Sequence, residues 1–337
     1  MKTKPIPKVL ALLLMAVMLI TVTACEGNES SEQGRTPAQN NGNISNGGDE
    51  NPANEPPPVV ISTDREGNSI TLPETMDKIV SIGPSNTEIL VALGFGDKII
   101  AADAWSDNVL GITPGVAMLP SFAEIDNEFL IDLQPDVIIV SGMSKIGGNN
   151  PLQLVEDTGI CVIVIPSSTS IDGIKEDIRF LAAVMGAAAR GEEIVAEMER
   201  GINEIKAIGA AIAAADRKTV YFEISPAPHM FSFGSGTFLN EMIEIIGAVN
   251  ILADQDSWTG VSDEIVLDAN PDVILTSTNF LDDAIGEIMG RPGWNAITAV
   301  QNEAVFYIDA DSSNRPSHHI IKALREMAAA VYPELFS

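Results

Sequence analysis

The sequence predicts an α/β protein made of two pseudo-symmetric lobes with mostly parallel central sheets, joined by one long α-helix. Three observations predict this fold class. Apolar, strand-like runs alternate with helical patterns, a segment of the first half recurs in the second half, and one long amphipathic pattern separates the halves. A chain of 337 residues with 45% apolar content also has room for two cores, because single cores rarely grow beyond roughly 250 residues.

Short apolar runs mark the candidate strands. In the first half they lie at 78–83, 98–103, 136–141 and 161–166, and in the second half at 219–225, 272–277 and 304–309. Continuous apolar strands that alternate with helices are typical of a parallel sheet that is buried on both faces. Ahead of them, residues 59–63 and 69–73 flank the turn-rich sequence DREGN and predict a β-hairpin.

The repeat joins residues 128–139, EFLIDLQPDVII, to residues 264–275, EIVLDANPDVIL. In both copies a glutamate, Glu128 or Glu264, precedes a Pro-Asp pair by seven residues. The pattern predicts a short helix that ends before the proline and is followed by a buried strand. One copy in each half indicates two pseudo-symmetric lobes.

A long helix is predicted between the halves, within residues 187–215. Its apolar residues recur every three or four positions, at Ile194, Met198, Ile202, Ile205, Ile208 and Ile212. Such a helix would be about 40 Å long, although Gly201 and Gly209 would each cost about 1 kcal/mol relative to alanine. We therefore assign 59–186 to an N-terminal lobe, 187–216 to the connecting helix and 217–337 to a C-terminal lobe. A stiff helical connection predicts a small closing motion.

The N-terminus has the order of a secretory signal peptide, residues 1–24. Three lysines precede an uncharged run over 9–22, and small residues then lead to Cys25. The run is shorter than the roughly twenty residues of a membrane span, and an uncleaved transmembrane anchor is the alternative. Residues 22–25, Val-Thr-Ala-Cys, resemble a bacterial lipobox, which implies cleavage before Cys25 and lipidation of its thiol.

The segment after the lipobox, 25–58, is rich in Gly, Asn, Ser, Glu and Pro and predicts a flexible tether with an r.m.s. span of about 30 Å. With two acyl chains at Cys25, the protein would be anchored to the extracytoplasmic side of the cell membrane. Cys161 lies in an apolar run and predicts a buried thiol. A lipidated Cys25 would leave no partner for a disulfide. The formal charge of −28 excludes nucleic acid as a partner.

Several motifs together carry a family resemblance. They are the repeat, SNTEIL at 85–90 with ALG at 92–94, FLNEMIEIIG at 238–247, Gly293-Trp294, Ala299-Val300 and AAAVYPE at 328–334. From about Val59 to Phe336 the chain resembles the class III periplasmic-binding proteins, which deliver iron chelates and cobalamin to ABC importers. The resemblance implies a solute-binding lipoprotein that captures an iron-siderophore or a corrinoid between its lobes. The ligand would pass to a permease dimer with its ATPase. The protein itself would need no cofactor and no metal site, while its ligand can carry iron or cobalt.

By the same resemblance, a glutamate on top of each lobe contacts arginines of the permease dimer, and Glu128 and Glu264 match those positions. The alternative is a carboxylate in the first turn of a helix, favoured by the helix dipole. Both roles can hold together. Glu88 is interpreted differently, because Ser85-x-x-Glu88 before an apolar run is a capping box.

The ligand is expected between the lobes, against loops at strand ends. The resemblance places aromatic walls at Trp105, Phe122 and Trp258, and the loop with His229 and Met230 is a further candidate. Aromatic faces suit a large, partly apolar chelate or macrocycle. Ordinary packing is the alternative for each of these residues.

The segment from Arg315 to His319 departs from the family's common Arg-Pro-Gly-Pro-Arg, because His319 stands where the second arginine would be. This loss argues against a highly anionic chelate, although Arg315 could still anchor a carboxylate or phosphate. His318 and His319 are adjacent and should diverge, so they are not expected to bind one metal together. A single histidine could ligate the metal of haem or of a corrinoid, or simply form a hydrogen bond.

Three alternatives to chelate capture remain open. These motifs do not distinguish a haem-binding lipoprotein from one that binds an iron-siderophore or a corrinoid. A bare-metal-binding protein would need three or four convergent ligands, whereas the chain has three histidines and two are neighbours. An exported hydrolase is disfavoured because the sequence has no G-x-S-x-G, H-E-x-x-H or P-loop motif.

Overall fold

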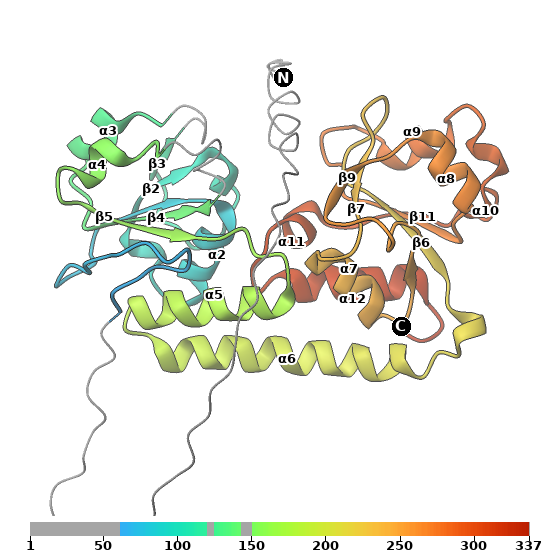
Figure 1. Ribbon diagram of the computed structural model, residues 1–337, viewed down its shortest axis with the longest axis horizontal. Helices are drawn as coiled ribbons and strands as arrows, with labels where there is room; N and C mark the ends of the chain where they lie inside the picture. Colours follow the sequence, from blue (N-terminus) through green and yellow to red (C-terminus); the bar gives the residue numbers. More distant parts are fainter. Residues whose placement is uncertain (1–60, 120–124, 143–149, 337) are drawn as a thin grey trace, which may run out of the picture. The chain divides into compact units, whose positions relative to one another are not determined.

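The first lobe is built on a parallel sheet. The computed structural model describes residues 61–119, 125–142 and 150–336, so the predicted signal peptide, Cys25, the tether and Phe122 lie outside the described residues. The strand order is β3-β2-β1-β4-β5, and Figure 1 labels β2, β3, β4 and β5 of this sheet. The strands are β1 (Ile79–Ile82), β2 (Ile99–Asp103), β3 (Ala117–Leu119), β4 (Val137–Ser141) and β5 (Cys161–Ile165), and all neighbours pair in parallel. Their buried apolar residues confirm the predicted sheet.

The second lobe contains a parallel sheet of order β11-β10-β6-β8 and a separate antiparallel pair, β7-β9. Its strands are β6 (Thr219–Glu223), β7 (Phe231–Phe233), β8 (Val249–Asn250), β9 (Trp258–Gly260), β10 (Val273–Thr276) and β11 (Val305–Tyr307). The expectation that Trp258 lies in a loop is wrong, because it begins β9, and the loop with His229 and Met230 leads directly into β7. Strands β7 (Phe-Ser-Phe) and β9 (Trp-Thr-Gly) contain no continuous apolar run, so the sequence pattern does not mark them as strands.

The repeat has a structural role in both lobes. Asp136 accepts hydrogen bonds at 2.8 and 2.9 Å from the backbone N–H groups of Asp77 and Lys78, which lead into β1. In the second lobe Asp272 accepts from the N–H and hydroxyl of Thr219 in β6, both at 2.8 Å. Each aspartate therefore ties its own strand, β4 or β10, to the neighbouring strand. The predicted pseudo-symmetry is confirmed at the level of individual hydrogen bonds.

The helices complete the two lobes. They are α2 (Pro84–Ala92), α3 (Asn127–Asp132), α4 (Gln153–Glu156), α5 (Ile171–Val184), α6 (Ala188–Ala210), α7 (Phe238–Ile245), α8 (Asp263–Ala269), α9 (Ala284–Met289), α10 (Thr298–Gln301), α11 (Ala310–Asn314) and α12 (Ile320–Val331). Single 3₁₀ turns lie at Gly96–Lys98, Ala104–Ser106, Ala214–Asp216 and Trp294–Ala296.

The long connecting helix is α6, of 23 residues, and it is unbroken. It packs on α5 of the first lobe and on α7 and α12 of the second (Figure 1). Its glycines are packing residues. A Cβ at Gly191 would lie 2.4 Å from the Cβ of Ala182 in α5, and one at Gly209 would lie 2.3 Å from the carbonyl oxygen of Ile245 in α7. The glycines lower helix propensity but allow α6 to approach both neighbours closely.

One apolar core passes through both lobes. It includes Ile79 and Ile139 of the first sheet, Phe222 and Leu275 of the second, and residues of α5, α6, α7 and α12. Two smaller cores cover the other faces of the two sheets. Continuous packing of this kind stiffens the connection between the lobes. The small closing motion expected from the sequence stays a prediction.

The hairpin ahead of the first lobe contains an antiparallel bridge between Thr63 and Ser69. Its turn is organised by Asp64, which accepts from the N–H groups of Glu66 and Asn68 and from Val164 of β5. These bonds fasten the hairpin to the edge of the first sheet.

Candidate functional site

Trp105 lies at the carboxyl end of β2, on a turn that a buried carboxylate holds in place. Asp103 accepts hydrogen bonds from the N–H groups of Gly83 and Trp105 at 2.7 and 2.9 Å, and from the hydroxyl of Ser106 at 2.9 Å. The backbone around Trp105 is therefore ordered, while 45% of the residue is exposed. An exposed aromatic side chain on an ordered turn suits contact with a ligand.

Trp258 belongs to an aromatic cluster in the second lobe. Its ring centroid lies 6.0 Å from that of Phe233 and 6.4 Å from that of Phe238, both in edge-to-face geometry. The side chain is half-buried, so part of its surface packs in the lobe and part remains accessible. Both predicted roles of Trp258, packing and ligand contact, are compatible with this position.

Met230 and His229 differ in accessibility. Met230 is buried, and its sulfur accepts a hydrogen bond from Arg291 at 3.2 Å. His229 is exposed. Of these two predicted ligand contacts, only His229 presents its side chain to solvent.

The arginine behind Met230 forms a buried ion pair that the sequence did not reveal. Arg291 donates two hydrogen bonds, at 2.6 and 2.7 Å, to Glu223 at the carboxyl end of β6, and it also pairs with Glu287 of α9. Burial raises the pKa of Glu223, and Arg291 opposes that rise. Burial alone would lower the pKa of Arg291, but Glu223 and Glu287 raise it. Its guanidinium also lies 4.4 Å from the ring centroid of Trp294.

Glu88 does not form a capping box. The N-cap of α2 is Gly83, which makes no side-chain capping bond. The carboxylate of Glu88 instead crosses to the second lobe, where it accepts from Arg315 at 2.8 Å and from the hydroxyl of Ser317. The prediction was wrong because a residue 227 positions along the chain supplies the partner, and no local pattern reports it.

Arg315 lies between α11 and α12 and is surrounded by acceptors. Besides Glu88, it pairs with Asp311 at 2.7 Å and donates to the carbonyl oxygen of Trp105 and to the side chain of Asn108, both at 3.0 Å. The structure thus joins two predicted ligand contacts, Trp105 and Arg315. The contact is a hydrogen bond from the Arg315 side chain to the backbone carbonyl oxygen of Trp105, and it does not involve the indole ring.

The expectation that the side chains of His318 and His319 diverge is wrong, because their ring centroids lie 4.0 Å apart. Burial lowers the pKa of His318 to about 4, and the charges of His319 and Arg190 add to that effect. Among the described residues, nothing donates to or accepts from its buried Nδ1. His318 is therefore a neutral group at the seam of the lobes near pH 7.

Glu128 and Glu264, the predicted docking residues, are exposed in the first turns of α3 and α8. A hydrogen bond from Ser262, together with the backbone, lowers the pKa of Glu264. Glu264 also borders an open surface hollow of about 580 Å³ with Ile265, Leu267 and Asp268. Both carboxylates are free to face a partner.

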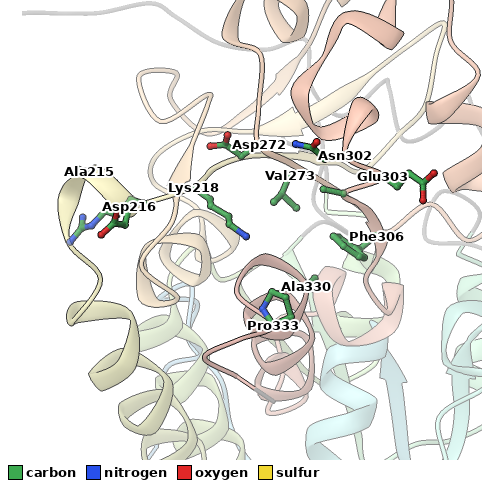
Figure 2. A pocket seen from close by; sticks show the side chains of 12 residues that line it. Ala215, Asp216, Lys218, Asp272, Val273, Asn302, Glu303, Phe306, Ala330 and Pro333 are labelled. Carbon is green, nitrogen blue, oxygen red and sulfur yellow. The ribbon is translucent and has the colours of Figure 1, made fainter.

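A second hollow, of about 470 Å³, lies in the second lobe. Lys218, Asp272 and Phe306 are among its lining residues (Figure 2). Lys218 and Asp272 directly precede β6 and β10, and the lining residues Asn302, Glu303 and Ala304 precede β11, so the hollow is at the amino ends of these strands. Ligands of such sheets bind at the carboxyl ends, and this hollow is not the predicted site.

Cys161 is half-buried and carries a free thiol, and burial raises its pKa to about 11. Within 61–119, 125–142 and 150–336, no three His, Cys, Asp or Glu side chains are placed to hold a metal ion. No helix in the same ranges is both long and apolar enough to span a bilayer.

Sequence comparison identifies a family match. Residues 79–312 match the family model described as periplasmic binding protein. A protein of Bacillus subtilis named as an uncharacterized ABC transporter substrate-binding lipoprotein, YvrC, is 30% identical over 282 residues, covering 83% of this chain and 87% of the relative. A vitamin B12-binding protein of Vibrio cholerae is 28% identical over 261 residues, covering 76% of this chain and 89% of the relative.

Solved structures give the same fold. A possible iron-binding, periplasmic solute-binding protein of Staphylococcus epidermidis superposes with a TM-score of 0.67 at 27% identity, covering 76% of this chain and 98% of that chain. The vitamin B12-binding protein BtuF of Vibrio cholerae superposes with a TM-score of 0.60 at 26% identity, covering 76% of this chain and 97% of that chain.

Proposed function

The chain belongs to the periplasmic binding protein family, and on that premise we propose that it is the extracytoplasmic substrate-binding lipoprotein of an ABC importer. Its ligand is an iron-siderophore or a corrinoid, held between the two lobes and delivered to a permease dimer with its ATPase. It is a binding protein and not an enzyme. The observation that carries the proposal is the pair of pseudo-symmetric parallel sheets with one accessible aromatic residue in each lobe, the exposed Trp105 after β2 and the half-buried Trp258 in β9.

The ligand class is supported by both the site and the relatives. Aromatic faces contribute affinity to large, partly apolar ligands through buried area and stacking. Several relatives are named as vitamin B12-binding or cobalamin-binding proteins, the latter including one of Halobacterium salinarum that is 24% identical. We propose Trp105, His229 and Trp258 as the ligand contacts within the described residues, and Phe122 as a further contact; the buried Met230 is next to His229 in the sequence and contacts Arg291 instead.

Docking is proposed through the two equivalent carboxylates. Glu128 and Glu264 occupy the same position in the two copies of the repeat, on α3 and α8. A partner with two-fold symmetry, such as a permease dimer, offers the same basic surface twice, so one such residue on each lobe fits it. Exposed carboxylates also accelerate encounter with a basic partner.

Lipidation of Cys25 would hold the protein at the membrane. The relative in Bacillus subtilis is itself named as a lipoprotein. We expect Cys25→Ser to move the protein from the membrane fraction to the soluble fraction without changing ligand affinity. Retention of the variant in washed membranes would contradict lipid anchoring and would favour an uncleaved signal segment.

The test of the proposed function is ligand titration of the purified full-length chain in mild detergent. Cyanocobalamin, haem and a panel of ferric siderophores are added while tryptophan fluorescence and thermal unfolding are followed. A ligand at one hundred times its Kd should add about 2.7 kcal/mol to the free energy of unfolding. Trp105 and Trp258 should report its binding. Absence of binding by every member of the panel would contradict the proposed ligand class.

A further inference from the structure

A polar network crosses from the first lobe to the second around one guanidinium. Arg315 of the second lobe contacts Glu88 in α2 and the turn that holds Trp105 and Asn108, all of the first lobe. Asn108 in turn donates to Asp311 of α11 at 2.6 Å. The side chains of Glu88 and Arg315 are 5% and 12% exposed, so water competes little for their contacts.

The donors and the charge of Arg315 are already used within the protein. One terminal nitrogen, Nη1, donates to Glu88, and the other, Nη2, lies within bonding distance of Asp311, Asn108 and the Trp105 carbonyl oxygen. Two carboxylates around one guanidinium leave the group with a net negative charge. A carboxylate or phosphate of a ligand would meet repulsion here and would have to displace acceptors that are already held in place.

We propose that Arg315 is a positioning residue, an inter-lobe latch that fixes the Trp105 turn against the second lobe, and that it does not anchor an anionic group of the ligand. This inference rests on the proposed function in one respect, namely that Trp105 forms part of the ligand wall. The latch and Asp103 hold the turn from two sides. Asp103 binds the N–H of Trp105, and Arg315 binds its carbonyl oxygen.

The two roles of Arg315 predict opposite effects of one substitution. Glu88→Gln removes a carboxylate that occupies Arg315. If Arg315 is an anion anchor, the released guanidinium should bind an anionic ligand more tightly. If Arg315 is a latch, Glu88→Gln should raise the Kd of neutral and anionic ligands by the same factor, about tenfold, because a charge-assisted hydrogen bond between the lobes is lost.

Lys322→Gln provides the matched control. Lys322 also pairs with two carboxylates, Asp309 and Glu326, at 3.1 and 3.8 Å, but all three residues belong to the second lobe. The control therefore removes a more exposed network, with the Lys322 side chain 55% exposed, that does not cross between the lobes. Arg315→Gln is included to remove the latch from its other side.

The experiment has a ligand-free and a ligand-bound arm, both on the full-length chain. In the ligand-free arm, hydrogen exchange is followed in peptides that cover 84–92 and 104–109. We expect both segments to exchange about tenfold faster in Glu88→Gln and Arg315→Gln than in the wild type or in Lys322→Gln. In the ligand-bound arm, the Kd values of cyanocobalamin and of an anionic ferric siderophore are compared across the same variants.

Each outcome decides one of the two proposals. Faster exchange together with equal loss of affinity for both ligands supports the latch. Exchange no faster than in Lys322→Gln, or tighter binding of the anionic siderophore by Glu88→Gln, overturns it. If the wild type binds neither ligand, the proposed ligand class fails, and the exchange comparison still decides whether Arg315 holds the Trp105 turn.

Discussion

Replacing Arg291 by methionine should test how much the buried ion pair of the second lobe stabilises the fold. Arg291→Met keeps most of the apolar side chain but leaves the carboxylate of Glu223, which is 1% exposed, without its bidentate partner. Removing one member of a buried pair typically costs about 3–5 kcal/mol, because the remaining charge is not compensated. Loss of the contact with the ring of Trp294 adds to this cost.

The assay is urea unfolding followed by circular dichroism at pH 7, with thermal unfolding as a second measurement. A loss of about 3–5 kcal/mol corresponds to a fall in Tm on the order of 10 °C for a body of this size. The matched control is Arg179→Met. Arg179 forms a similar bidentate pair with Glu192, but the two side chains are 41% and 61% exposed, so solvent screens the pair and the expected loss is much smaller.

The pH dependence gives an independent check. Burial already raises the pKa of Glu223, and loss of Arg291 should raise it further. A carboxyl whose folded pKa is raised binds its proton more readily in the folded state, so the penalty in Arg291→Met should shrink as the pH falls from 7 towards the unfolded pKa. The double variant with Glu223→Gln should recover much of the loss. Equal destabilisation by Arg291→Met and Arg179→Met would refute the reasoning.

Three further predictions follow from other parts of the structure. Gly209→Ala should destabilise the fold by about 1–3 kcal/mol, because its Cβ would meet a backbone carbonyl oxygen of α7, whereas Gly260→Ala, with open space around it, should be nearly neutral in urea unfolding. Burial lowers the pKa of His318 to about 4 from its ordinary 6.5, so the free energy of unfolding should fall by up to about 3 kcal/mol as the pH drops from 6.5 to 4. His318→Asn should remove this pH dependence. The same loss of stability between pH 6.5 and 4 in the variant would contradict the prediction. The pair Glu128→Lys and Glu264→Lys should abolish import by cells while leaving the Kd for the ligand unchanged, and normal import would exclude the proposed docking role.

Much of the fold could be predicted because it depends on local patterns. The seven predicted apolar runs contain β1, β2, β4, β5, β6, β10 and β11, and the spacing of its isoleucines predicted α6. The strands β3, β7, β8 and β9 were not predicted, and each has only two or three residues. Strand β8 has two residues, and β9 is recognisable only through its pairing with β7.

The candidate site could be predicted only in part, because its residues depend on distant partners. The pattern Ser85-x-x-Glu88 is a good capping signal, yet the carboxylate pairs with Arg315 in the other lobe. Arg291 lies two residues before the Gly293-Trp294 motif, but that motif does not indicate its partner Glu223, which is 68 residues away. Met230 was expected at the ligand surface, but the same arginine draws its sulfur inward.

The apolar core that passes through both lobes has a consequence for folding. Units that share one core should lose their structure together, since neither can expose its half without removing contacts from the other. The two lobes should therefore unfold in a single cooperative transition despite their internal repeat. A ligand that binds the native state should then slow exchange of the most protected amides in both sheets equally.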